Sequence, residues 1–261
     1  AHLYSSIKRL PEEPLRLLHQ LSIFDGRVLS SAIPDSGTSA LNYLIDIRIL
    51  DVHLEQEPCV SLNILIRHQV RRDIDNTQQE FFRKRGLELM CNILNKYHQE
   101  RSIDDFVTAI NQCYSALREI ISWGISSDDL QAKELASNLL IICQEYWKVF
   151  TERSDDYLAL LRIAANNSNS LKPSLELEIN LLTGVELNKR NLTGIFEESI
   201  VCLERALEIA ISLDNSVTIA RVAYALESAY SQSNRDAVKV NEIAKIVNAQ
   251  VTKRGQIDES T

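Results

Sequence analysis

Apolar residues recur at helical spacing in three stretches near the start of the chain. The spacing predicts one helix over residues 11–23, a short helix over residues 28–33 and a third helix that begins near Ala40. Residues 34–37, with the sequence Pro-Asp-Ser-Gly, are typical of a turn and separate the second helix from the third. The chain is therefore predicted to begin with a small helical cluster.

Two short apolar runs that follow, residues 49–54 and 59–62, do not fit this helical spacing. Apolar and polar side chains alternate within them, and the polar residues 55–58 lie between them, so the pattern predicts a β-hairpin. A further helix is then predicted, with its apolar residues on one face: Leu65, Ile66, Val70 and Ile74. A hairpin that lies beside helices and leads into a new helix is typical of a winged helix, which we expect over residues 1–75.

Every later segment is predicted to be helical. Residues 77–80 have the sequence of a capping box, and Ser102 is placed to cap the following helix, which we expect to end near Gly124. The acidic residues 128 and 129 mark the start of a helix that runs to about residue 150. Shorter helices are predicted over residues 153–165 and 174–188.

The helices in the last third of the chain follow a repeating pattern. Residues 196–210 resemble the second helix of a tetratricopeptide repeat, because small Ser199 and Ala206 occupy close-packing positions and Leu203 fills the larger one. Ala244 is the predicted counterpart of Ala206 in the next repeat. The prediction is an all-α chain with a winged helix and its small hairpin at 1–75, a tetratricopeptide-like α-α superhelix at 76–250 and a polar tail at 251–261.

Composition narrows the class of function. The formal charge of −8 disfavours a general nucleic-acid or anionic-membrane binder, and no apolar run approaches the roughly 18 residues of a membrane span. The five cysteines are scattered, which favours free thiols in a reducing compartment. We therefore expect a cytoplasmic protein. Because the chain starts without Met or a signal peptide, we also expect an excised fragment or a processed product.

The chain contains none of the common catalytic motifs. It lacks the phosphate-binding Gly-x-x-x-x-Gly-Lys-Ser/Thr motif, the metal-binding His-Glu-x-x-His motif and the nucleophile motif Gly-x-Ser-x-Gly. Its five histidines are isolated from one another in the sequence. We therefore expect no catalytic residue, no metal site and no cofactor within this chain.

Three segments resemble a known family. Residues 10–26 and 40–50, followed by Leu62-Asn63-Ile64-Leu65, are similar to the winged helix that follows the ATPase core in STAND-type signalling ATPases. That class includes plant resistance proteins, apoptotic ATPases and bacterial regulators. The resemblance implies that a nucleotide-binding domain holding ATP or ADP lies outside this chain. Asn63 occupies the position of the histidine that touches the phosphates of bound ADP in this family, so the resemblance makes it the nucleotide-sensor position.

Two further groups of residues are candidate contacts. Arg67, Arg71 and Arg72 form a local basic patch. In one interpretation these arginines contact DNA phosphates, and in the simpler one they lie on a solvated helix face. In the superhelix, the first helix of each pair faces a groove. The candidate groove contacts are Asn180, Asn188, Tyr224, Glu227 and Ser231.

The sequence thus predicts the regulatory and sensor part of a STAND-type ATPase. Its superhelix would bind a protein, peptide or small-molecule trigger, and its winged helix would relay that event to its own or a partner nucleotide-binding domain. Two alternatives stay open at this point. One is a free-standing adaptor for protein–protein interaction, and the other is a winged-helix DNA-binding regulator that uses the basic patch.

Overall fold

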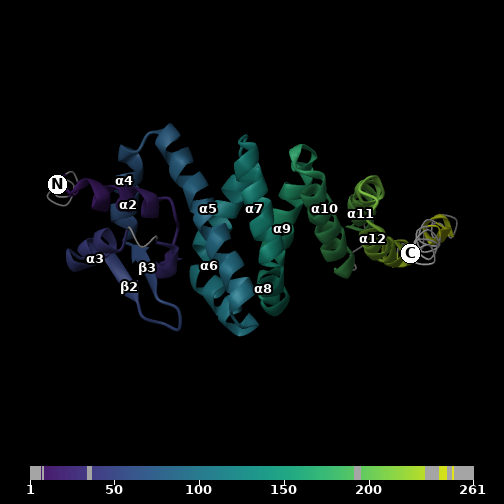
Figure 1. Ribbon diagram of the computed structural model, residues 1–261, viewed down its shortest axis with the longest axis horizontal. Coiled ribbons are helices and arrows are strands. Elements are labelled where there is room, and N and C mark those ends of the chain that lie inside the picture. Colours follow the sequence, from purple (N-terminus) through teal and green to yellow (C-terminus); the bar gives the residue numbers. More distant parts are fainter. Residues whose placement is uncertain are drawn as a thin grey trace, which may run out of the picture. The chain divides into compact units, whose positions relative to one another are not determined.

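The chain forms two compact units, the first ending at Arg153 and the second beginning at Ser154. The computed structural model describes residues 7, 9–33, 37–190, 195–232, 241–245 and 249. Both units are mostly helical, and the first also contains a small three-stranded antiparallel sheet (Figure 1), which agrees with the predicted all-α class. The boundary predicted after residue 75 lies inside the first unit.

The sheet is built around the last of its three strands. Helix α2 (Glu12–Ser22) precedes β1 (Arg27–Leu29) and the 3₁₀ turn η1 (Ser30–Ala32), and α3 (Thr38–Asp46) precedes β2 (Leu50–His53), β3 (Cys59–Leu62) and α4 (Ile64–Asp73). Strand β3 pairs antiparallel with both neighbours, so the strand order is β1-β3-β2. The predicted hairpin is β2 and β3.

Strand β1 corrects the prediction of a short helix over residues 28–33. Val28 pairs with Val60 and Leu29 with Cys59, so the backbone of this segment is extended and hydrogen-bonded to β3. A run of two buried apolar residues is too short for its spacing to separate helix from strand. The partner that decides the matter lies about thirty residues further along the chain.

Longer helices complete the first unit: α5 (Asn76–Glu100), α6 (Ile103–Ser126), α7 (Leu130–Ile142), α8 (Gln144–Val149) and the 3₁₀ turn η3 (Thr151–Arg153). Ser102 caps α6 as predicted, whereas the capping box of α5 is formed by Asp75 and Gln78, two residues before the predicted one. The single helix predicted up to residue 150 is divided into α7 and α8 at Cys143.

Gly124 does not end α6 but lies within it. A Cβ atom there would lie 2.6 Å from the Cβ of Ala136 on α7, so the missing side chain allows α6 and α7 to pack closely. Helix α6 is instead kinked at Cys113, whose φ and ψ of −105° and 16° are not helical. This kink becomes important below, because it lies next to a cavity.

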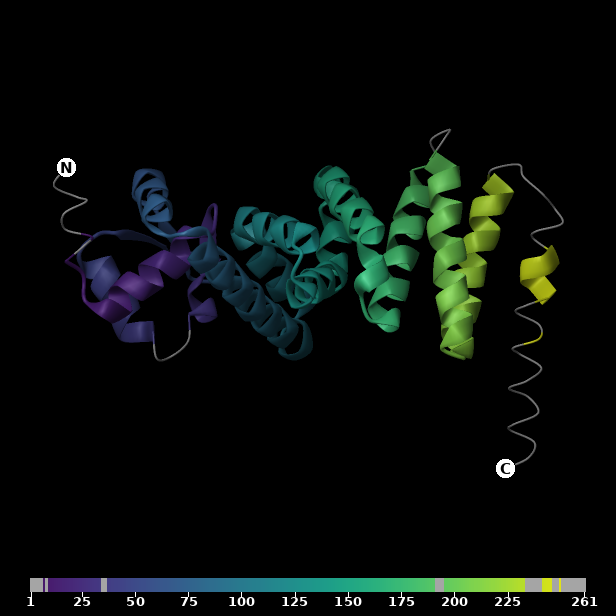
Figure 2. The ribbon, with the colours of Figure 1, turned by 90° about the horizontal axis from the view of Figure 1, so that it is seen from above.

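The second unit consists of α9 (Ser154–Asn166), the 3₁₀ turn η4 (Ser168–Ser170), α10 (Pro173–Lys189), α11 (Ile195–Ser212) and α12 (Ser216–Gln232). Figure 2 shows α10, α11 and α12 lying side by side at its green and yellow end. Leu203 and Ala206 are buried in the core that these helices share, and Ser199 is fully buried, as the repeat pattern predicted.

A glycine permits the closest contact in this second unit. A Cβ atom on Gly184 of α10 would lie 2.5 Å from Leu203 Cγ and 3.1 Å from the carbonyl oxygen of Ser199. The hydroxyl of Ser199 donates to the carbonyl oxygen of Gly184 at 2.7 Å. Ile243 packs into the same core, but Ala244 is exposed and so differs from its predicted counterpart Ala206. The rest of that predicted helix and the predicted tail lie outside the described residues.

None of the helices described here combines the length and apolar character needed to cross a membrane.

Candidate functional site

Asn63 has a structural role at the start of α4. It is the N-cap residue, and its Oδ1 accepts a hydrogen bond from the backbone N–H of Leu65 at 2.9 Å. Its side chain is exposed, and the next two residues, Ile64 and Leu65, expose 55% and 74% of their surface. Asn63, the predicted nucleotide-sensor position, therefore lies directly after strand β3, beside two exposed apolar residues at the start of α4.

The predicted basic patch is divided by the structure. Arg71 donates from Nη2 to the carbonyl oxygen of Ile23 at 2.6 Å and from Nε to that of Ser22, and Arg67 donates to the carbonyl oxygen of Phe24 at 3.1 Å. These carbonyls follow the last turn of α2, where helices leave carbonyl groups without partners. Two of the three arginines thus cap a helix inside the protein.

Two acidic residues join these arginines and connect them with α6. Arg67 and Arg71 lie 3.2 and 3.3 Å from Asp25 Oδ1, and Arg71 Nη2 lies 3.4 Å from Glu119 Oε1. Glu119 also accepts the backbone N–H of Asp25 at 2.7 Å. Asp25, Arg67, Arg71 and Glu119 form what we call the Arg71 network. Of the predicted patch, Arg72 alone is classed as exposed.

Burial sets the ionisation of Glu119 within the Arg71 network. Loss of hydration raises the pKa of its carboxyl, while the positive charge of Arg71 acts in the opposite direction. The nearby charge of Asp25 raises the pKa further, because two negative charges repel. The network is therefore sensitive to each of its charged members.

The five predicted groove residues fall into two groups. Tyr224, Glu227 and Ser231 lie on one exposed face of α12, and Tyr224 is 77% exposed. Asn188 on α10 is half-buried, and its Nδ2 donates to the hydroxyl of Ser228 at 3.2 Å. The structure brings the three α12 residues together at the surface.

Asn180 corrects the prediction for that set. It is 5% exposed, and its Nδ2 donates to the backbone carbonyl of Glu176 at 2.9 Å and to Ser168 Oγ at 3.2 Å. Because α10 packs against α9, η4 and α11, most of its surface is covered, which the assumption of one open helix face did not allow for. Asn180 therefore stabilises the interior and lines no groove.

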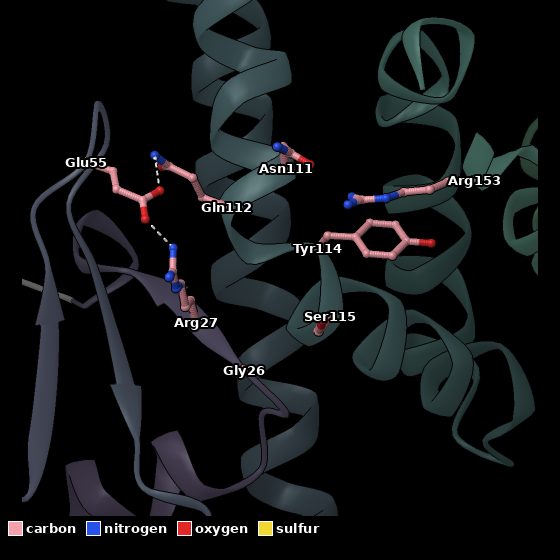
Figure 3. Close-up of a pocket in the computed structure, with 8 residues that line it drawn as sticks. All are labelled: Gly26, Arg27, Glu55, Asn111, Gln112, Tyr114, Ser115 and Arg153. Carbon is pink, nitrogen blue, oxygen red and sulfur yellow. Dashed lines mark hydrogen bonds and ion pairs between the residues drawn. The ribbon is translucent and has the colours of Figure 1, made fainter. Parts of the chain in front are cut away.

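A cavity that the sequence did not predict lies in the first unit (Figure 3). Its volume is about 390 Å³. The residues that line it come from the start of β1, the turn between β2 and β3, helix α6 and the turn η3: Gly26, Arg27, Glu55, Asn111, Gln112, Tyr114, Ser115 and Arg153.

The local backbone explains why these segments meet. Gly26 has a φ of +115°, which residues with a side chain rarely adopt, and a Cβ atom there would lie 3.2 Å from the Cβ of Ser115. The start of β1 can therefore approach α6 closely. On α6 itself the kink at Cys113 falls between Gln112 and Tyr114, so both sides of the kink contribute to the cavity wall.

Polar groups on one side of the cavity satisfy one another. Arg27 forms an ion pair with Glu55, and Gln112 Nε2 donates to Glu55 Oε2 at 3.3 Å. The thiol of Cys59 in turn lies 3.8 Å from Gln112 Oε1 as a weak donor. On this side of the cavity, the polar groups are therefore bound to one another.

The opposite side is built on aromatic rings. The guanidinium of Arg153 lies 4.0 Å from the ring centroid of Tyr114 and 5.6 Å from that of Phe150, and its Nη1 donates to the hydroxyl oxygen of Tyr146. Tyr146 Oη lies 3.4 Å from Asn111 Oδ1. Burial raises the pKa of Tyr146 to about 12, so the phenol stays neutral and can donate its proton to that oxygen.

Local sequence patterns contain little signal for this cavity. Its lining residues lie in four segments separated by tens of positions, and none belongs to the set predicted from the sequence. The sequence analysis did not single out Arg153, because its contact with the ring of Tyr114 joins residues 39 positions apart. Within the described part of the chain, no cluster of His, Cys, Asp and Glu is arranged to hold a metal ion.

No known protein family, curated protein or solved structure matches this chain.

Proposed function

We propose that this chain is the regulatory and sensor part of a STAND-type signalling ATPase, with a winged helix at its start and a tetratricopeptide-like superhelix after it. The strand order β1-β3-β2 carries the proposal. In a winged helix the first strand precedes the hairpin in the sequence and pairs with the second strand of the hairpin. Here the element order is α2, β1, α3, β2 and β3, and β1 pairs with β3.

The second unit supports the superhelical part of the proposal. Successive helices α10, α11 and α12 pack pairwise, and buried small residues, Gly184, Ser199 and Ala206, lie where α10 and α11 pack or within their shared core. Stacked helix pairs of this kind leave surfaces suited to binding a partner. The exposed residues Tyr224 and Glu227 of α12 are the contacts we propose for a trigger.

The relay would be a rigid-body movement of the winged helix against the nucleotide-binding domain. The Arg71 network supports this view, because it joins the end of α2 to α4 and to α6 through charged hydrogen bonds. Helices held in this way move together. The exposed start of α4, with Asn63, Ile64 and Leu65, is the surface proposed to face the nucleotide-binding domain.

The experiment is ADP release from the full-length product of the gene, with and without Asn63→His. Restoring the histidine of the family should slow ADP release and lower basal activation, because the imidazole can contact the phosphates. Asn63→Ala is the matched control, since it removes the helix cap, at a cost of about 1 kcal/mol of stability, without adding an imidazole.

Two results would count against the proposal. A full-length product that binds no nucleotide would exclude a STAND-type ATPase. Equal ADP release from the Asn63→His and Asn63→Ala proteins would show that this position does not sense the phosphates.

The exposed face of α12 also favours a second candidate, a free-standing adaptor. Tyr224 is largely exposed although aromatic, which is typical of residues at binding surfaces. An adaptor would bind its partner equally well with and without nucleotide, and would lose it when Tyr224 and Glu227 are both changed to Ala. DNA binding is not proposed, because Arg67 and Arg71 are held in the Arg71 network.

A further inference from the structure

We propose that the cavity of Figure 3 binds a small molecule through a carboxylate group, with Arg153 as the principal contact. The inference rests on the cavity alone and holds whether or not the chain belongs to an ATPase. Three observations carry the inference: aromatic rings position Arg153, the described residues offer it no acidic partner, and it lies at the edge of a polar cavity.

Arg153 has unused hydrogen-bonding capacity. A guanidinium carries five N–H donors, and the described residues offer Arg153 one acceptor, the hydroxyl oxygen of Tyr146. No carboxylate of the described residues lies within ion-pair distance of it. The rings of Tyr114 and Phe150 attract its charge but accept no hydrogen bond at the edge of the guanidinium plane, so the N–H groups other than the one bound to Tyr146 are left for a ligand.

Asn111 supplies a second donor on the same helix as Tyr114. The hydroxyl of Tyr146 accepts from Arg153 and donates to Asn111 Oδ1, which fixes the oxygen end of the amide toward Tyr146. The amide nitrogen of Asn111 is then the end left for a ligand. Figure 3 shows Arg153 and Tyr114 lying across the cavity from the Arg27–Glu55 pair, with the Asn111 amide between the two sides.

Charge selects the chemical class of the ligand. Arg27 and Arg153 are positive and Glu55 is negative, so the lining carries one uncompensated positive charge. A carboxylate carries a single negative charge and matches the planar fork of an arginine. A phosphate monoester carries about −1.5 to −2 at neutral pH and would leave the site negative. The cavity volume of about 390 Å³ suits a small molecule.

The kink of α6 connects this site with the shape of the helix. Asn111 precedes Cys113 and Tyr114 follows it, so a ligand held by Arg153 over Tyr114 and by Asn111 touches both sides of the kink. Trp147 lies edge-on to Tyr114, with 5.4 Å between ring centroids. Binding should therefore also change the fluorescence of Trp147.

The test is an NMR titration of the arginine side-chain N–H signals with sodium acetate, at ionic strength held constant with sodium chloride. We expect a saturable shift of the Arg153 signal, and a loss of affinity of about tenfold or more in Arg153→Gln, since a charged hydrogen bond is removed. Arg101→Gln is the matched control, because Arg101 also lies over a tyrosine, Tyr97, but outside the cavity. It should leave the titration unchanged.

A second variant separates binding from folding. Asn111→Asp keeps the size of the side chain and leaves the ring contacts of Arg153 in place, but it replaces the free donor with a negative charge. We expect it, too, to weaken acetate binding. The proposal would be overturned by a shift that does not saturate, by unchanged affinity in both variants, or by tighter binding of inorganic phosphate than of acetate.

Discussion

Two helix junctions, one in each compact unit, are held by different kinds of contact. In the first unit, the end of α2 is joined to α4 and α6 by charged groups of the Arg71 network, which bind backbone carbonyls as well as one another. In the second unit, α10 and α11 meet through Gly184, Leu203 and a buried serine hydroxyl. The first junction is held by charged groups that bind backbone carbonyls, whereas the second is held by close packing around one buried hydrogen bond.

The difference follows from distance along the chain. The Arg71 network joins segments near residues 25, 71 and 119, whereas the close contact of the second unit joins the consecutive helices α10 and α11. Directional contacts fix how distant segments meet, and the cavity of the first unit also arises where distant segments meet. In the second unit, consecutive helices pack on one another, and α12 keeps one exposed face.

The largest effect should come from Arg71→Met. The substitution leaves the carbonyls of Ser22 and Ile23 without a donor and Glu119 without its cation, while methionine fills much of the volume. Loss of a partly buried charged group that makes several hydrogen bonds costs about 3 kcal/mol. Urea unfolding followed by tryptophan fluorescence measures this directly, because both tryptophans, Trp123 and Trp147, lie in the first unit.

Two other arginines sharpen this comparison. Arg72→Met, next to the network but exposed, should change the free energy of unfolding by no more than about 0.5 kcal/mol. Arg205→Met in the second unit leaves the buried carboxylate of Glu176 without its cation, but the Arg205 side chain is 46% exposed, so the expected loss is about 1 kcal/mol, smaller than for Arg71. Equal losses for Arg71 and Arg205 would remove the proposed difference between the units.

A smaller loss is expected when the close contact in the second unit is disturbed by Gly184→Ala. Alanine favours the helix by about 1 kcal/mol, but its Cβ would overlap Leu203 and approach the carbonyl of Ser199, and overpacking costs about 1–3 kcal/mol. We expect a net loss of about 1 kcal/mol, measured by hydrogen exchange of the α10 and α11 amides.

Relief of that overlap is the control for this prediction. In the Leu203→Ala background, Gly184→Ala should destabilise the protein less, since the Leu203 side chain is gone and the helix preference remains, while the carbonyl oxygen of Ser199 stays 3.1 Å from the new Cβ. Destabilisation of the same size in both backgrounds would show that overlap with Leu203 is not the cause.

Much of the second unit could be predicted from the sequence because its signals are local. Helical spacing located α9 to α11 to within a few residues, and the small residues Ser199 and Ala206 are buried as predicted. The exposed positions were less certain. Asn180 has the polarity of a surface residue, yet its amide bonds to Ser168 and Glu176 in the interior, which only the position of η4 reveals.

The first unit was predicted less completely because distant pairing decides its details. Strand β1 is defined by its pairing with β3, and two of the three arginines of the basic patch are internal because Arg67 and Arg71 bind backbone carbonyls at the end of α2. The cavity forms where four separate segments meet beside the kink at Cys113. No proline or glycine lies at this point of the sequence, so the kink could not be predicted. Local patterns located the helices and the hairpin, while the contacts that define a site depended on the folded chain.

The smallest expected effect concerns the ionisation of Glu119 in the Arg71 network of the first unit. Burial raises the pKa of this carboxyl above its ordinary value, so the folded state binds a proton more readily than the unfolded state. The contribution of Glu119 to stability must therefore decrease as the pH rises from the ordinary glutamate range through the raised pKa.

Arg71→Met should raise the pKa of Glu119 further, because Arg71 lowers it, and Asp25→Asn should bring it down, because Asp25 raises it. Carboxyl-carbon NMR titration measures each change, and shifts in the reverse directions would show that burial and charge do not act on Glu119 as the Arg71 network requires.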